Sequence, residues 1–340
     1  MAKIITLGEI MLRLSTENHK RLTQANQLDI SFGGGEANVT ISLANYGHHA
    51  CFVTKLPTNA LGDSCMHFLS SRSVDTKNIV RGGKRIGLYF LETGVSIRPS
   101  SVLYDRQYSS FSEASLDDFD WESIFQDADW FHITGITPAL GKNGVMITEY
   151  ALKKARALGI TTSLDLNYRS KLWTPEQAQK VMVPLMAYVD VCIGNEEDST
   201  HVLGMKLNRS NAMQAEINID DYQMMLKRMM DQFHFKYVAT SLRTSFSATK
   251  NDWQGLLYDG KAFYLSKKYT LDPILDRVGA GDAFAAGLIH GLLHKDANDA
   301  IEFAVAASAL KHTIFGDSND VTEVEVRNLM KGNQSGRVQR

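Results

Sequence analysis

The stretch from Asp276 to Gly287, DRVGAGDAFAAG, constrains this chain of 340 residues more than any other feature. Its glycines and alanine form a turn with almost no side-chain bulk, and the run of small apolar residues that follows predicts a helix. Such a turn exposes backbone N–H groups where the helix dipole places about half a positive charge. The stretch therefore predicts an anion site, and phosphate is the anion that fits it best.

Asp282 lies inside this turn, where its negative charge would repel a phosphate ligand. A carboxylate at this point makes sense if it accepts the proton of an attacking hydroxyl group. Its position at a helix N-terminus predicts a low pKa, so that it stays ionised at pH 7. Four backbone N–H groups would then form the anion hole, those of Gly279, Ala280, Gly281 and Asp282. The alternative is a tight turn in which Asp282 only caps the helix.

The composition is that of an ordinary globular protein. Hydrophobic residues make up 44% and charged residues 22%, and the formal net charge is −2. This balance argues against a nucleic-acid partner or a membrane surface. No apolar run approaches the ~20 residues of a membrane helix, and the N-terminus predicts a strand rather than a signal peptide. We therefore expect a cytoplasmic protein.

The cysteines and histidines give no sign of a disulfide framework or a metal centre. Cys51, Cys65 and Cys192 are odd in number and scattered, without a CxxC pair or a paired histidine nearby. The pair His48-His49 is expected in a turn, and His132 in a buried strand. No histidine shows metal-ligand spacing to another ligand, so the sequence predicts neither disulfides nor zinc.

Short apolar runs alternate with helical patterns along most of the chain. Strands are predicted at 3–7, 51–54, 131–135, 160–165, 189–194 and 237–240, and helices at 37–46, 61–71, 144–158, 175–188, 220–233 and 283–313. This alternation predicts an α/β fold with a mostly parallel sheet covered on both faces. Ligands gather at the carboxyl ends of such strands. The polar segments 165–169 and 194–197 and the turn at Gly279 all follow strands, so we expect them at one edge of the sheet.

The segment 87–111 departs from this pattern. Residues 87–94 and 101–108 are strand-like, aromatic and mixed in polarity, with turn residues between them. They predict a small antiparallel sheet that stands off the main domain. An ordinary surface hairpin is the alternative.

Two motifs together resemble the signatures of the ribokinase-like carbohydrate kinases. One is the Asp276–Gly287 stretch, and the other is the segment 32–40, FGGGEANVT. The resemblance implies a three-layer α/β/α domain with a mostly parallel central sheet, formed by 1–10, 34–86 and 113–331. It also implies an antiparallel lid over the sugar, formed by 11–33 and 87–112, and a homodimer through that lid. Residues 332–340 are expected to be a flexible tail.

Within that family the chain is most similar to the 2-keto-3-deoxygluconate kinases. The supporting residues include Tyr89, the segments 104–106 and 165–173, and the segment 314–317, IFGD. The resemblance assigns sugar contacts to Gly34, Gly35, Asn38, Tyr89, Tyr104, Arg106 and Arg169. Two guanidinium groups suit an acid sugar, because they bind a carboxylate in a fork. Taken from the residues alone, the glycines could be a second phosphate loop and the arginines surface ion-pair partners.

The resemblance also implies ATP as phosphoryl donor, Mg²⁺, and a monovalent cation as a further possibility. Nucleotide contacts would come from Asn167, Asn195, Thr240, Ser241, Arg243, Gly279 and Gly281. Asp198 would hold Mg²⁺ through water, since Mg²⁺ keeps several waters in proteins. A helix cap with an acidic first turn accounts for 195–198 equally well. The family's usual glycines are missing from 240–245, which leaves a donor other than ATP open.

The leading hypothesis is thus an acid-sugar kinase with Asp282 as general base. A fructokinase, a ribokinase or a nucleoside kinase of the same family is the nearest alternative. A sugar-binding regulatory protein without turnover comes from a different class, and the altered segment 240–245 favours it. A dinucleotide-dependent dehydrogenase is disfavoured, because no GxGxxG follows the first strand.

Overall fold

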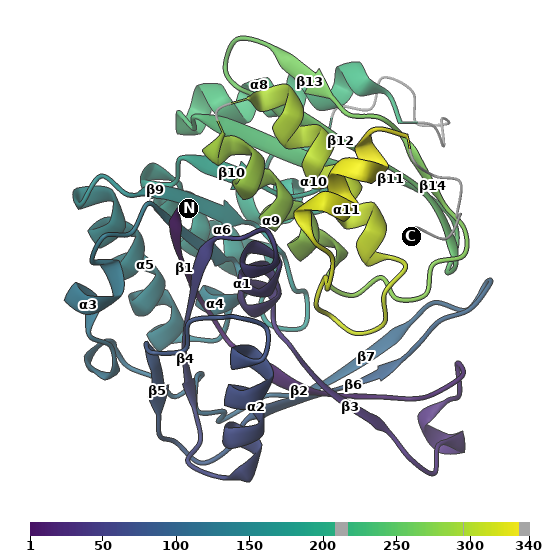
Figure 1. Ribbon diagram of the computed structural model, residues 1–340. Coiled ribbons are helices and arrows are strands. Elements are labelled where there is room, and N and C mark those ends of the chain that lie inside the picture. The colour runs from purple at the N-terminus through teal and green to yellow at the C-terminus, as the bar shows by residue number, and fades with distance from the viewer. Residues whose placement is uncertain (208–216, 295, 333–340) are drawn as a thin grey trace.

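The computed structural model describes residues 1–207, 217–294 and 296–332. In this part of the chain a main sheet of ten strands carries helices on both faces, and a second sheet of four strands projects from it (Figure 1). The main sheet has the order β13-β12-β11-β10-β9-β8-β1-β4-β5, with β14 paired to β12. Its strands are β1 Lys3–Leu7, β4 His49–Leu56, β5 Ile79–Arg81, β8 Trp130–Thr134, β9 Thr161–Asp165, β10 Val191–Ile193, β11 Tyr237–Ser247, β12 Lys250–Tyr258, β13 Phe263–Leu265 and β14 Tyr269–Leu271.

The centre of the main sheet is parallel, as predicted. From β11 across to β5 every neighbouring pair runs in the same direction. The pairs that β12 makes with β11, β13 and β14 are antiparallel. Parallel strands place their carboxyl ends at one edge, so the loops that follow β1, β8, β9 and β10 converge there.

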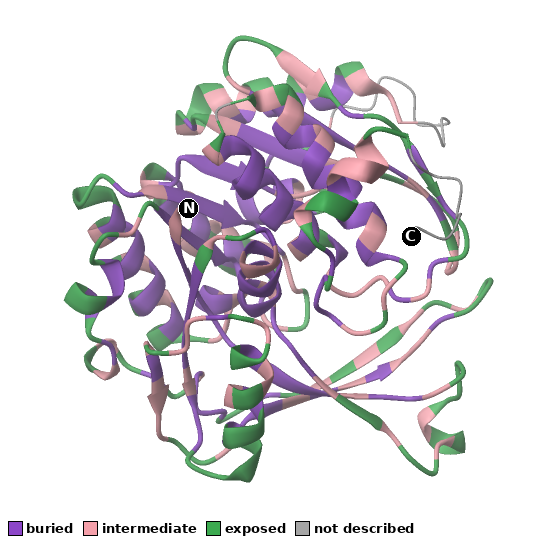
Figure 2. Cartoon of the chain, in the orientation of Figure 1, coloured by how far each residue is buried: buried purple, intermediate pink, exposed green. Residues whose placement is uncertain are grey.

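Helices cover the two faces because successive strand residues point to opposite sides. Ile5 and Phe131 pack with α3, α5, α6 and α8, whereas their neighbours Ile4 and Trp130 pack with α1, α9 and α10. Figure 2 shows the buried strands between these layers. The helices are α1 Gly35–Asn45, α2 Ala60–Ser70, α3 Trp121–Phe125, α4 Ile136–Ala139, α5 Lys142–Ala157, α6 Pro175–Leu185, α7 Glu196–Leu203, α8 Ile219–Phe233, α9 Ala280–Leu293, α10 Ala297–Lys311 and α11 Glu323–Met330, with short 3₁₀ turns at Leu22–Gln24, Leu116–Asp118 and Met186–Tyr188. Within the described residues, none of these helices has the length and apolar character needed to cross a bilayer.

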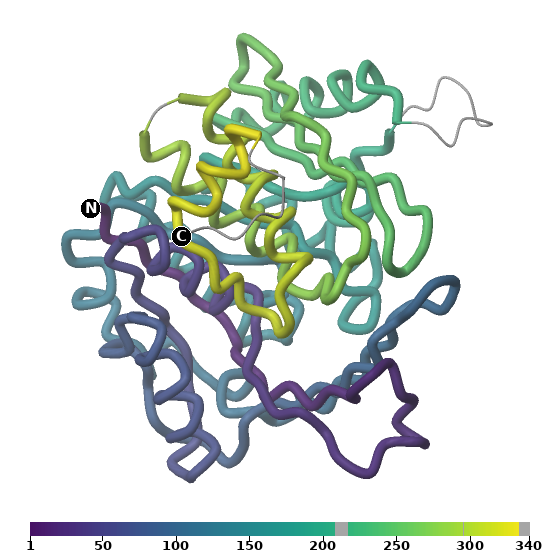
Figure 3. Tube along the Cα trace, turned by 45° about the vertical axis from the view of Figure 1, so that its right-hand side comes forward, coloured from purple at the N-terminus to yellow at the C-terminus, as the bar shows by residue number. Residues whose placement is uncertain are grey.

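The second sheet has the order β3-β2-β6-β7 and forms the lid. Its strands are β2 Met11–Ser15, β3 Asp29–Gly33, β6 Gly87–Glu92 and β7 Ser101–Asp105. The prediction of a purely antiparallel lid was wrong, because β2 and β6 pair in parallel. Both strands leave the main domain in the same direction, and each returns through its own hairpin partner. Figure 3 shows these two segments, far apart in sequence, running side by side out of the body of the molecule.

The predicted helix 283–313 is two helices, α9 and α10, and Asp296 caps the second. Gly287 and Gly291 lie where α9 crosses α10, and an added Cβ would come within 2.8 Å of the Ala304 Cα and 2.3 Å of the Ala300 Cα. The two glycines therefore allow close helix packing. The expected flexible tail falls almost wholly on residues 333–340, outside the described part of the chain.

Candidate active site

A cavity of about 570 Å³ opens between the lid and the carboxyl edge of the main sheet. This volume lies in the ordinary range for small-molecule sites. The lid, the strand-end loops, the β11–β12 hairpin and the start of α9 all contribute to its wall. Of the residues predicted to bind or act, sixteen line it: Gly34, Gly35, Asn38, Tyr89, Tyr104, Arg106, Asn167, Arg169, Asn195, Asp198, Ser241, Arg243, Gly279, Ala280, Gly281 and Asp282. Thr240 does not.

The turn before α9, which is the predicted anion hole, borders the cavity. Gly279 is the N-cap residue with φ of 84°, a conformation that glycine adopts without strain. A Cβ at this position would lie 1.9 Å from the Asp317 carbonyl oxygen, so the chain passes too close for any side chain. The N–H of Ala280 turns back to the Arg277 carbonyl at 3.4 Å. The N–H groups of Gly281 and Asp282, in the same first turn, have no acceptor within the helix, and both residues line the cavity.

Asp282 does not have the low pKa that its helix position predicts. Burial raises the pKa of this carboxyl to about 6, although the Asn38 hydrogen bond and the charge of Arg169 lower it. The Asn38 Nδ2 group donates to Asp282 Oδ2 at 2.7 Å. Loss of hydration therefore outweighs the helix dipole here. A pKa near 6 leaves the group mostly ionised at pH 7 and makes it a stronger base than an ordinary Asp.

The GGGEAN segment brings α1 against the same cavity. Gly34 passes so close to the lid connection that an added Cβ would lie 2.1 Å from the Glu9 carbonyl oxygen. A Cβ added at Gly35 would lie 3.6 Å from Asp282 Oδ1 and 3.7 Å from Asn167 Nδ2. The absence of a side chain at Gly35 therefore keeps the space beside the Asp282 carboxylate open. Glu36 is fully buried and holds α1 to the end of β8, accepting from the Thr134 N–H at 3.0 Å and its hydroxyl at 2.8 Å. Burial raises the pKa of Glu36.

The lid side chains that were predicted to contact the sugar are already paired. Arg106 donates through Nε to Glu9 Oε2 at 2.8 Å, and its Nη2 binds the same oxygen. The Tyr89 hydroxyl lies 2.6 Å from both carboxylate oxygens of Asp317. Tyr104 is half-buried beside Tyr89, with ring centroids 6.0 Å apart. Arg106 and Tyr89 thus face the cavity in fixed orientations rather than as free side chains.

A buried ion-pair network ties the lid to the anion-hole loop. Arg13 of β2 donates to Asp276 Oδ2 at 2.5 Å and to Asp317 Oδ1 at 2.6 Å. Asp276 in turn accepts from the Val278 N–H at 3.0 Å, at the start of the glycine turn. The three charged groups are buried, and the surrounding carboxylates raise the pKa of Arg13 against the effect of its burial. The Arg13 guanidinium therefore links the lid to the loop, in addition to the hydrogen bond from Tyr89 to Asp317.

At the carboxyl edge of β9 and β10 the cavity wall is polar. Asn167 has φ of 39°, and its N–H donates to Asp165 Oδ1 at 3.2 Å. Asn195 caps α7 by accepting from the Glu197 and Asp198 N–H groups, so the helix-cap interpretation is correct for its side chain. Asp198 Oδ1 accepts from the Tyr168 N–H at 2.9 Å. Burial, and then the charges of Asp198 and Asp282, raise the pKa of Asp165 well above its usual value.

The segment 240–245, to which the resemblance assigns nucleotide contacts, forms no loop. It lies within β11, which pairs with β12 in a long antiparallel hairpin. Strand alternation turns Ser241, Arg243 and Ser245 toward the cavity. Thr240 is buried on the other side, which explains why it does not line the wall. A strand needs no glycine, which accounts for the absence of the family's usual glycines from 240–245.

Sequence reasoning missed several residues of the site. Glu9, Asp165 and Asp317 line the cavity, while Arg13 and Asp276 support it. Asp165 is the last residue of the strand predicted at 160–165 and was expected at the sheet edge without an assigned role, and Glu9 comes two positions after the strand predicted at 3–7. Arg13 carries no comparable signal, because its partners lie 263 and 304 residues away along the chain.

Comparisons with known proteins agree with this geometry. The model of the pfkB family of carbohydrate kinases matches residues 1–241 and 256–323. A solved structure of 2-dehydro-3-deoxygluconokinase from Thermotoga maritima is 48% identical, covers 98% of this chain and 100% of its own, and superposes with a TM-score of 0.94. The 2-dehydro-3-deoxygalactonokinase of Haloferax volcanii is 30% identical over 337 residues, 98% of each chain.

A more distant structure, a putative ribokinase II from E. coli solved with ATP and Mg²⁺, shares the fold. It is 18% identical with a TM-score of 0.76, and the match covers 98% of this chain and 100% of the other. The predicted ribokinase-like α/β architecture is therefore confirmed.

Proposed function

This chain belongs to the pfkB family of carbohydrate kinases, and on that premise we propose that it phosphorylates the terminal hydroxyl of a 2-keto-3-deoxy acid sugar with ATP. The observation that carries the proposal is the content of one cavity. It holds a half-buried carboxylate, Asp282, at a helix N-terminus, and it holds Arg169 close enough that the guanidinium charge lowers the pKa of that carboxyl. The cavity thus offers a base for a hydroxyl group and a cation for an acid group.

In the proposed reaction the sugar hydroxyl oxygen attacks the γ-phosphorus and its bond to ADP breaks. The hydroxyl proton passes to Asp282, which the Asn38 amide holds at 2.7 Å. The N–H groups at the start of α9 stabilise the charge on the transferred group, an effect that commonly contributes about 10²–10³ in rate per donor. The protein forms no covalent bond to the substrate in this reaction, because phosphoryl transfer depends mainly on the position of the reacting groups and on stabilisation of their charge.

Arg169 is our candidate for the sugar carboxylate. Two nitrogens of Arg106 bind the carboxylate of Glu9. Arg169 instead donates its hydrogen bond to a neutral group, the Tyr168 carbonyl, at 3.0 Å. A guanidinium bound only to a carbonyl keeps its full charge for an incoming carboxylate. We propose that Arg106, oriented by Glu9, contacts a sugar hydroxyl or the keto oxygen, with Tyr89 and Tyr104 covering the ring or chain.

We assign the nucleotide to the β11–β12 side, with Ser241 and Arg243 as contacts and Asn167 and Asn195 near the phosphates. The carboxylates of Asp165 and Asp198 fit Mg²⁺, because their mutual repulsion near Asp282 is relieved by a cation. Both oxygens of Asp198 accept backbone N–H groups, so it would hold the ion through water. Bound Mg²⁺ would neutralise charge on the phosphates of ATP.

The homodimer through the lid also stays a proposal. Ile30 on β3 and Leu103 on β7 are 68% and 58% exposed, which is unusual for such large apolar side chains on a small sheet. Pairing of two lids would bury them. Sedimentation of the full chain tests this, and a monomer at micromolar concentration would contradict it.

The substrate is tested by following ADP release from ATP with a panel of sugars. The panel contains 2-keto-3-deoxygluconate, its C4 epimer 2-keto-3-deoxygalactonate, fructose and ribose. We expect kcat/KM for at least one acid sugar to exceed that for the neutral sugars by about 10²-fold, the scale of a charge-assisted hydrogen-bond pair.

Arg169→Met should reduce that preference to below about tenfold, and Lys171→Met, which removes a neighbouring cation, is the matched control. Equal turnover of acid and neutral sugars would overturn the substrate assignment. Sugar binding without ADP release from any donor would instead favour the regulatory alternative.

A further inference from the structure

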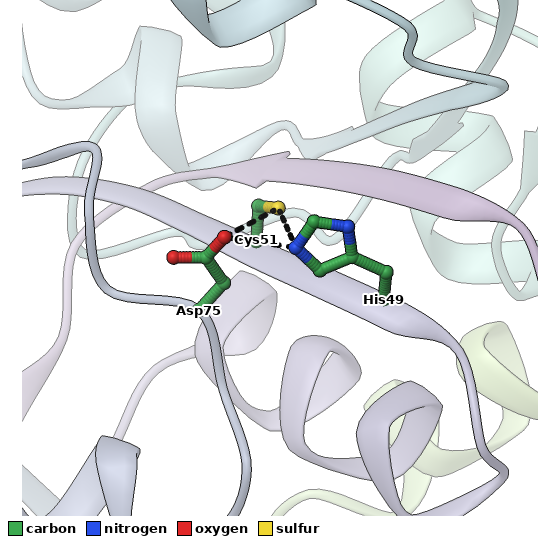
Figure 4. Close-up of side chains that lie close together, drawn as sticks. All are labelled: His49, Cys51 and Asp75. Carbon is green, nitrogen blue, oxygen red and sulfur yellow. Dashed lines mark hydrogen bonds and ion pairs between the residues drawn. The ribbon is translucent and has the colours of Figure 1, made fainter.

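The side chains of His49, Cys51 and Asp75 lie close together (Figure 4). They are at the amino end of β4, whereas the cavity lies at the carboxyl edge of the sheet. His49 is the first residue of β4, and Cys51 follows two positions later, so strand alternation puts both side chains on one face. Asp75 comes from the segment between α2 and β5 and forms a parallel bridge with Cys51. The kinase chemistry proposed above uses none of the three.

The ligand atoms of this cluster already have separations close to those around a tetrahedral metal ion. Cys51 Sγ lies 3.5 Å from His49 Nε2 and 3.6 Å from Asp75 Oδ2. Bonds of about 2.3 Å to sulfur and about 2.1 Å to nitrogen and oxygen separate tetrahedral ligand atoms by roughly 3.3–3.6 Å. His49 Nε2 and Asp75 Oδ2 are 2.8 Å apart, joined by a hydrogen bond. Only this pair must open, by roughly 0.5 Å, when an ion replaces the shared proton.

We propose that His49, Cys51 and Asp75 form a zinc site with one open coordination position for water. A thiolate, an imidazole nitrogen and a carboxylate oxygen are a ligand set that Zn²⁺ prefers over Mg²⁺ or Ca²⁺. A thiolate and a carboxylate also balance the two positive charges of the ion. The ion would have a structural role, because it would join β4 to the segment that leads into β5.

The surroundings hold the carboxylate in place for this role. The Lys77 N–H donates to Asp75 Oδ1 at 3.0 Å, which leaves Oδ2 directed at the cluster. The Asp75 backbone is fixed on both sides, since its N–H donates to the Ala50 carbonyl at 2.9 Å and its carbonyl accepts from the Phe52 N–H at 3.1 Å. Such contacts to a ligand's other atoms are what orient metal ligands in proteins.

An ion can reach this site from solvent. The His49 side chain is 46% exposed and that of Asp75 is 17% exposed, while Cys51 lies buried beneath them. The cluster therefore has an open side, on which a water molecule can complete the coordination. The spacing of two residues between His49 and Cys51 is a signal within the sequence, whereas only the fold brings Asp75 beside them.

Zinc binding releases a proton from the site, so the affinity for zinc should depend on pH. Burial, and then the charge of Asp75, raises the pKa of the Cys51 thiol to about 12, against the opposing charges of Lys3 on β1 and of Lys77. The thiol must release its proton to the solvent when the Zn–S bond forms. One released proton makes the apparent affinity rise about tenfold per pH unit near neutrality.

The test uses the full-length protein, freed of metal with a chelator and titrated with Zn²⁺ against a chromophoric competitor. We expect one equivalent per chain from the wild type, and at least a tenfold weaker affinity from His49→Gln and Cys51→Ala. His67→Gln, another exposed histidine, and Cys65→Ala, another buried thiol, are the matched controls and should bind as the wild type does. Kinase turnover reports that each variant is folded.

Co²⁺ provides a second readout that does not depend on affinity. Bound at this site, it should show a near-ultraviolet thiolate-to-metal charge-transfer band that persists in Cys65→Ala and vanishes in Cys51→Ala. Two results would overturn the proposal. One is a wild type that binds Zn²⁺ no more tightly than His49→Gln, and the other is a band that is absent or depends on Cys65.

Discussion

The two halves of the active-site cavity are built differently. On the lid side, the charged groups are buried and already paired, as in Arg106 with Glu9 and Arg13 with Asp276 and Asp317. On the hairpin side, Ser241, Arg243 and Ser245 project from β11, and Arg243 is exposed to solvent. The first half is preorganised before any ligand arrives, and the second offers side chains that must become ordered when the ligand binds.

We expect the preorganised lid side to add to the discrimination that Arg169 provides at the end of β9. Buried, hydrogen-bonded charges hold their geometry, and a wrong ligand that leaves one of them unpaired loses several kcal/mol. Exposed side chains adapt, and each contributes little because solvent screens its charge. Asp282 and the Gly279 turn lie where the two halves meet, so changes there should affect turnover rather than binding on either side.

The largest effect is expected for Asp282→Asn. It removes the proposed proton acceptor while preserving the shape of the cavity, and kcat should fall about 10²–10⁴-fold. Because burial raises the pKa of Asp282, the ionised carboxylate destabilises the fold, and the Asn variant should unfold at a higher denaturant concentration. That stability gain should be present above pH ~6 and shrink as the pH falls toward the unfolded-state pKa of ~4, where the wild-type carboxyl is protonated in both states.

Steady-state kinetics and urea unfolding measure both parts of this prediction. The dissociation constants of sugar and ATP should stay within about threefold of the wild type, since neither half of the cavity is altered. A variant with near-normal kcat would remove Asp282 from the role of base.

Gly279→Ala comes next. A methyl group there meets the Asp317 carbonyl oxygen at 1.9 Å, and φ of 84° is unfavourable for alanine. The turn must move, so kcat should fall about 10²-fold through loss of anion-hole geometry. Gly281→Ala is the matched control, because an added Cβ there finds no atom within 4 Å.

The two glycine variants are compared by kcat and by thermal unfolding. The melting temperature should fall for Gly279→Ala and stay level for Gly281→Ala. Equal melting temperatures would contradict the strain argument.

The pH dependence of kcat tests the role of Asp282 as the base. Asp282 accepts a proton only while ionised, and its pKa is raised to about 6 by burial. Turnover should therefore fall about tenfold between pH 7 and pH 5. In the Asp282→Asn variant this step should be missing. A wild-type profile flat down to pH 5 would instead support the low pKa that the helix dipole predicts.

The smallest effect is expected on the hairpin side. Arg243→Ala should raise the KM for ATP about fivefold, with kcat and the sugar KM unchanged, because one exposed charge contributes about 1 kcal/mol. Lys250→Ala, which removes an exposed cation from β12, is the control. An effect larger than that of Gly279→Ala would break the contrast between the two halves.

The sequence predicted the architecture well where the signal is local. The βα alternation predicted the parallel sheet, and every predicted strand of that sheet is present, with β11 running seven residues further than predicted. The prediction was wrong where strand pairing decides, as in the parallel contact of β2 with β6, and the strand predicted at 237–240 extends further because it pairs with β12. Strand partners are set by the course of the whole chain, and no local pattern encodes them.

The resemblance of two motifs indicated the family, and residue types and spacing alone predicted the glycine turn at the start of α9 and the edge of the sheet at which polar side chains gather. Tertiary structure alone decided the pKa of Asp282, the pairing of Arg13 across 304 residues and the meeting of Asp75 with Cys51. The physical reason is that turns and periodicity are properties of neighbours along the chain. Burial and charge pairing depend on what folds against a residue from elsewhere.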